Sequence, residues 1–170
     1  MTETKKTLTI TLEVRELMYD IRNKAWLTGQ AREAAQTANF AAASGMQMDG
    51  DDGDGYQLRR SLANAFATLK VVIGEYLDGD TTSADNKIGK IIDNDGQLTL
   101  SLSLPTNYNA ATADAVCNGA HAYLVDTALA EWLTITDKND AEDYATHAAT
   151  SLEIMRRALY RRTRPDRPEY

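Results

Sequence analysis

Two stretches of alternating apolar and polar residues decide the fold of this chain: Leu8-Thr-Ile-Thr-Leu-Glu-Val14 and Leu98-Thr-Leu-Ser-Leu-Ser-Leu104. Every second side chain in them is apolar, which is typical of a β-strand with one buried face. Each stretch is followed by two segments with helical periodicity. We therefore predict a βαα unit that occurs twice, with pseudo-repeat halves over residues 7–80 and 97–160.

Apolar residues recur at steps of three and four in four segments, which predicts four helices. The segments are 16–38, 58–77, 112–134 and 139–159. Asn109 or Thr112 is expected to cap the third helix. Because each strand has a single apolar face, one face of the sheet must lie on helices. The predicted fold is mainly α: a four-helix bundle with a small two-stranded antiparallel β element, in one domain over residues 1–160.

Composition limits the classes of function. The 170 residues carry a net charge of −7, which argues against nucleic-acid affinity spread over the whole surface. The single cysteine, Cys117, excludes an internal disulfide framework. No apolar stretch approaches the roughly 18 residues of a membrane span, and the N-terminus has no signal-peptide pattern. We expect a soluble protein without a membrane partner.

An acidic, glycine-rich stretch at residues 44–55 raises the question of a calcium site. An EF-hand loop needs oxygen ligands at positions 1, 3 and 5 and a glutamate at position 12. Starting from Asp49, position 5 is Gly53 and position 12 is Arg60, so the register fails. A solvated loop is expected, and a cation at residues 49–54 stays the alternative.

Catalytic motifs are missing from the sequence. It has no phosphate-binding loop, dinucleotide fingerprint, nucleophile elbow or zinc-protease motif. His121 and His147 fall on different predicted helices without a second ligand at metal spacing, and Cys117 fits a small packed residue. The chain is therefore not expected to be an enzyme or to need a cofactor. A helical-bundle enzyme built around the two histidines is the most distant alternative.

The basic residues are concentrated at the C-terminus. Six of the 18 lie in the last fifteen positions, after an otherwise acidic body. Prolines at 165 and 168 favour an extended arm over residues 161–170. The candidate interface residues of this arm are Arg161, Arg162, Arg164, Arg167 and Tyr170.

Such an arm suits docking onto an acidic neighbour, including a second copy of the chain. Two alternatives stay open: the arginines favour the negative end of a helix dipole, or they bind DNA non-specifically. Among the aromatic residues, Trp26 beside Gly29 is a further interface hypothesis.

With the run Glu16-Leu-Met-Tyr-Asp-Ile-Arg-Asn-Lys-Ala-Trp-Leu-Thr-Gly29 and the arginine-rich C-terminus, this small acidic helical chain resembles head–tail connector proteins of tailed bacteriophages. The resemblance implies a structural protein of the virion neck, assembled in the host bacterial cytoplasm. It implies a homo-oligomeric ring beneath the portal, with the portal and other neck and tail proteins as partners. DNA would pass through the channel without specific binding. The alternative is a cytoplasmic helical-bundle module that binds and regulates a partner protein.

Overall fold

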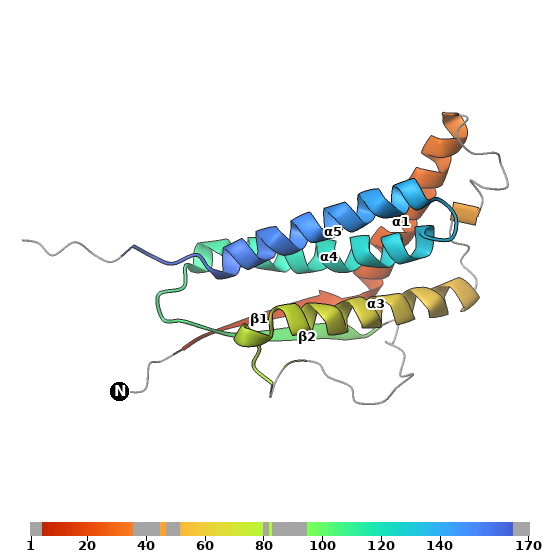
Figure 1. Cartoon of the computed structure of the whole chain (residues 1–170). Helices are drawn as coiled ribbons and strands as arrows, with labels where there is room; N and C mark the ends of the chain where they lie inside the picture. The colour runs from red at the N-terminus through yellow and green to blue at the C-terminus, as the bar shows by residue number, and fades with distance from the viewer. Residues whose placement is uncertain (1–4, 36–44, 47–51, 80–81, 83–94, 165–170) are drawn as a thin grey trace, which may run out of the picture.

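The computed structural model describes residues 5–35, 45–46, 52–79, 82 and 95–164 (Figure 1). The chain order is a strand, two helices, a second strand and two more helices. These elements are β1 Lys6–Glu13, α1 Val14–Ala34, α3 Asp52–Val72, β2 Gln97–Leu104, α4 Ala113–Leu133 and α5 Lys138–Leu159. The predicted fold class, mainly α with a small antiparallel sheet, is confirmed.

The two alternating stretches pair with each other. β1 and β2 run antiparallel in a register that places Lys6 opposite Leu104 and Glu13 opposite Gln97. Leu100 and Leu102 of β2 are fully buried, because the apolar face of the sheet joins the same core as all four helices. The alternation in the sequence thus sets which face of the sheet is covered.

Helix α4 lies at the centre of the helical layer and packs against α1, α3 and α5. Figure 1 shows α4 and α5 side by side along most of their length. They approach closely at Gly119, where an added Cβ atom would lie 2.8 Å from the Cβ of Met155. Contacts with three helices explain why α4 is apolar around almost its whole circumference.

Several helix boundaries differ from the prediction. The first strand runs directly into α1, so this helix begins at Val14 and not near Glu16. Helix α3 begins at Asp52, so the last residues of the predicted acidic loop form its first turn, where the negative charge of Asp54 suits the helix dipole. Residues 44 and 47–51 of that loop lie outside the described residues.

The structure also shows how the N-termini of α4 and α5 are capped. Asp137 caps α5, because its carboxylate accepts hydrogen bonds from the backbone N–H groups of Asn139 and Asp140. Asn109 caps the short 3-10 turn Ala110–Thr112 that precedes α4. Thr112 precedes α4 directly, but its hydroxyl donates to the carbonyl of Ala158 in α5.

The order of elements repeats along the chain, whereas their packing does not. Helices α4 and α5 form a close antiparallel pair, while α1 and α3 each pack onto α4. Helix α1 crosses behind α4 and α5, and its C-terminal end rises past them (Figure 1). The two βαα units therefore contribute differently to the surface.

Candidate functional site

Helix α1 carries a line of polar side chains, each of which bonds to α4 or α5. The pairs are Asp20–His121, Lys24–Asp126, Thr28–Tyr144 and Arg32–Asp140. Residues four apart in a helix lie one turn apart on the same side. The four pairs thus form one continuous line, which we call the polar ladder.

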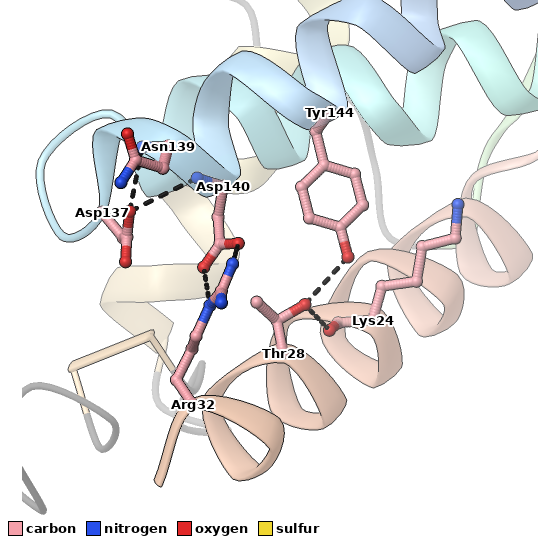
Figure 2. Close-up of polar contacts among 7 residues, drawn as sticks. All are labelled: Lys24, Thr28, Arg32, Asp137, Asn139, Asp140 and Tyr144. Atoms are coloured by element: carbon pink, nitrogen blue, oxygen red, sulfur yellow. Dashed lines mark hydrogen bonds and ion pairs between the residues drawn. The ribbon is translucent and has the colours of Figure 1, made fainter. Parts of the chain in front are cut away.

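At the C-terminal end of the ladder, Arg32 holds Asp140 with two hydrogen bonds (Figure 2). Its Nε donates to Asp140 Oδ2 at 2.9 Å, and its Nη2 donates to Oδ1. The Asp140 side chain is only 6% exposed. Hydrogen bonding to this carboxylate raises the pKa of the Arg32 guanidinium further above its ordinary value. A bidentate pair of this kind fixes the angle between two helices as well as their distance.

The middle of the ladder combines a neutral contact with a buried charge. The Thr28 hydroxyl donates to the Lys24 carbonyl at 2.8 Å, so the Tyr144 hydroxyl donates to Thr28, also at 2.8 Å (Figure 2). The Lys24 ammonium lies 2.7 Å from Asp126 Oδ1. Asp126 is almost entirely buried, and an aspartate at such a position needs a cation beside it.

At the N-terminal end, His121 Nε2 lies 2.7 Å from Asp20 Oδ2, with both side chains partly exposed. His147 instead meets the ring of Tyr144 edge-on. The two histidines thus have different partners. Among the described residues no group of three His, Cys, Asp or Glu side chains could hold a metal ion. The chemical role of the ladder is to join α1 to α4 and α5, because each of its polar groups bonds to a group on one of these helices.

The opposite side of α1 faces solvent and carries large aromatic side chains. Tyr19 is 64% exposed and Trp26 is 45% exposed, while the adjacent Leu27 is 50% exposed. Asn23 and Gln30 lie on the same outer side, so the aromatic residues are set in a polar border. We call Tyr19, Trp26 and Leu27 the outer face of α1. The polar ladder and the core hold the other sides of the helix in place.

The predicted C-terminal arm begins with residues that are fixed to their own chain. The Arg161 carbonyl accepts from the Asn109 N–H, and the Thr163 N–H donates to the Asn107 carbonyl at 2.8 Å. Arg162 Nη1 donates to the Leu159 carbonyl at the end of α5.

Of the proposed interface residues in the arm, the structure leaves Arg161 and Arg164 exposed. Arg167 and Tyr170 lie outside the described residues. Residues 161–163 of the predicted arm are therefore held against the body of the chain.

The ladder residues were not identified from the sequence, although a signal was present. Hydrogen-bonding side chains at 20, 24, 28 and 32 repeat every four residues beside the apolar stripe of the same helix. Such a row predicts a polar contact with a neighbouring helix, but it does not name the partner residues. Trp26, in contrast, was identified as an interface candidate, and its exposure agrees with that hypothesis.

Comparisons with protein families, with curated proteins and with solved structures find no significant match for this chain. Within the described part of the chain, no helix is long and apolar enough to cross a membrane.

Proposed function

We propose that this chain is a structural assembly protein, and that its specific role is that of a head–tail connector subunit in a bacteriophage neck. The main observation behind the proposal is the outer face of α1. It is an exposed aromatic surface on a helix that the polar ladder joins to its neighbours. Aromatic residues are enriched at the centres of protein interfaces, where they bury a large area at a small entropic cost. A rigid helix lowers the cost of binding further, since little has to be ordered.

The resemblance to connector proteins falls on the same element. The run from Glu16 to Gly29 that resembles them lies entirely within α1 and includes two aromatic residues of the outer face, Tyr19 and Trp26. A ring needs a surface on each subunit that fits a different surface on the next one. The outer face of α1 is our candidate for one of these two surfaces.

The charge of the chain supports the more specific role, that of a head–tail connector subunit. A net charge of −7 suits the wall of a DNA channel, because repulsion keeps the passing DNA from binding. Arg164 is exposed, and its positive charge suits contact with an acidic neighbouring protein.

The test is the mass of the purified protein in solution, measured by light scattering over a range of concentrations. We expect a large oligomer for the natural sequence. The double variant Tyr19→Ser with Trp26→Ser should weaken assembly by about a hundredfold or more, the effect typical of losing central aromatic residues.

Val71→Ser is the matched control, because Val71 is 81% exposed on a different helix, α3. This variant should assemble like the natural protein. A shortened chain ending at Arg164 separates the contribution of the arm without removing the packed residues 161–163. A natural protein that stays monomeric at every concentration would contradict self-assembly and favour the regulatory binding module.

A further inference from the structure

The two edges of the small sheet differ in whether other residues of the chain bond to them. On the outer edge of β2, the Asp78 N–H donates to the Ser101 carbonyl at 2.8 Å, and the Thr82 hydroxyl accepts from the Ser101 N–H at 3.1 Å. Leu77 also forms a bridge with Leu102. The edge of β2 is therefore already occupied by residues of the same chain.

The outer edge of β1 has open hydrogen-bonding groups. The Val14 N–H donates to the Gly96 carbonyl, which shows that the even-numbered residues of β1 bond to β2. In an antiparallel pair the intervening residues point their N–H and C=O groups to the other side. These residues are Thr7, Thr9 and Thr11, and within the described ranges no residue bonds to their backbone groups.

This edge also lacks the usual protection against pairing. Exposed edge strands normally carry a proline, a bulge or a central charge that prevents another strand from adding. Between Thr7 and Leu12 the strand has none of these, and Thr7, Thr9 and Thr11 are exposed β-branched residues that favour sheet structure. The flanking charged residues Lys5 and Glu13 stand at opposite ends.

We propose that β1 is a self-association edge, at which two copies of this chain pair antiparallel around a two-fold axis at Thr9. The result is a four-stranded sheet in the order β2-β1-β1-β2. Thr9 then exchanges two hydrogen bonds with Thr9 of the second copy, and Thr7 pairs with Thr11. Two-fold pairing satisfies both edges at once, as expected of an isologous dimer.

Charge selects this register. With the axis at Thr9, Lys5 stands directly opposite Glu13 of the second copy, and the pair occurs twice. Moving the axis by one residue along β1 would place Lys5 opposite Arg15 or opposite Thr11. Cross-strand opposite charges stabilise a sheet, and like charges destabilise it. Leu8, which is only half-buried in the single chain, gains Ile10 of the second copy as its neighbour on the apolar face.

This inference goes beyond the proposed function. A two-fold contact through β1 joins two copies and closes on itself, whereas a ring contact through α1 joins each subunit to the next. The test therefore uses the Tyr19→Ser, Trp26→Ser background, in which only the β1 contact should remain. If the α1 substitutions abolish the ring, the β1 dimer can still be measured in that variant. If a β1 substitution abolishes the dimer, ring formation can still be measured in a chain that keeps the natural α1 face.

Disulfide trapping tests the register. Thr9→Cys is combined with Cys117→Ser to remove the native thiol. Facing residues of a hydrogen-bonded pair have Cα atoms about 5.5 Å apart, within reach of a disulfide. The control is Thr7→Cys, whose two copies would lie four residues apart along the strands, roughly 13 Å. We expect a covalent dimer under oxidation for Thr9→Cys alone. Equal trapping at position 7, or none at position 9, would overturn the proposal.

A backbone test measures the strength of pairing by analytical ultracentrifugation. Proline at position 9 is compatible with the pairing of β1 and β2, because the Thr9 N–H faces away from β2. Thr9→Pro removes two hydrogen bonds per dimer and should raise the dimer Kd about thirtyfold or more. Thr9→Val keeps the N–H and should dimerise like its parent. An unchanged Kd in Thr9→Pro would overturn the proposal.

A charge exchange covers the case in which the proline variant fails to fold. Lys5→Glu and Glu13→Lys, made singly, each put like charges opposite one another and should weaken the dimer. The double variant restores the opposite charges and should dimerise like the parent. Failure of the double variant to recover would show that Lys5 and Glu13 do not face each other, and would overturn the register.

Discussion

The close contact of Gly119 with α5 makes Gly119→Ala a direct test of the packing between α4 and α5. A Cβ atom at this position would lie 2.8 Å from the Cβ of Met155 and 3.1 Å from the carbonyl oxygen of Ser151. Both atoms belong to the backbone of α5 or are attached directly to it. No rotation of a side chain can relieve the contact, so α5 itself must move away from α4.

The expected magnitude combines two opposing effects. Alanine in a helix interior is about 1 kcal/mol more favourable than glycine. Overpacking a tight contact costs about 1–3 kcal/mol, and the upper end applies here because backbone has to shift. We therefore expect Gly119→Ala to lower the free energy of unfolding by about 2 kcal/mol, which corresponds to a fall in Tm of about 4–8 °C for a chain of this size.

Gly53→Ala is the matched control, because it makes the same substitution in another helix. An added Cβ at Gly53 in α3 has no neighbour within 4 Å. Only the helix preference acts there, and it is weaker in the first turn than in the interior, so stability should rise by about 0.5 kcal/mol or less. Urea unfolding followed by circular dichroism measures both variants. A Gly119→Ala protein as stable as the natural one would refute the close packing of α4 on α5.

Two further predictions concern the ladder and the half-buried phenol of Tyr76. Lys24→Met leaves the buried Asp126 carboxylate without its ammonium partner; because Lys24 is partly solvated, we expect a loss of about 1–2 kcal/mol in urea unfolding. Adding Asp126→Leu to Lys24→Met should restore part of the lost free energy of unfolding. A double variant as unstable as Lys24→Met alone would contradict the pairing. Burial raises the pKa of the Tyr76 phenol above its ordinary value, and its contact with Tyr160 acts in the same direction. The folded state thus favours neutral Tyr76, so the contribution of Tyr76 to stability is constant below about pH 10 and declines above it as the unfolded chain ionises. Tyr76→Phe should reduce this alkaline decline in unfolding midpoints, and an identical pH profile would contradict the assignment.

Local patterns determined the secondary structure of this protein. The alternation at residues 8–14 and 98–104 predicted both strands, because a strand with one buried face must alternate. The α4 segment, apolar around almost its whole circumference, was still recognised as a helix, but its central position could not be read from it. A uniform apolar surface does not show how many neighbours a helix has. The predicted start of α4 at Thr112 is correct, but its side chain does not cap the helix because the hydroxyl bonds to α5 instead.

For the candidate surfaces on α1 and β1, too, the sequence determined one part and the tertiary structure the other. The sequence alone determined which residues of α1 are apolar and which are polar, and it marked Trp26 as an interface candidate. Only the tertiary structure decided that Arg32 meets Asp140, because a side chain can be matched to a partner 108 positions away only once both helices are placed. The same holds for the sheet: both strands alternate alike, and the positions of Leu77, Asp78 and Thr82 leave β1 as the open edge. Sequence periodicity sets what each element must bury, whereas long-range packing decides which surfaces remain for other molecules.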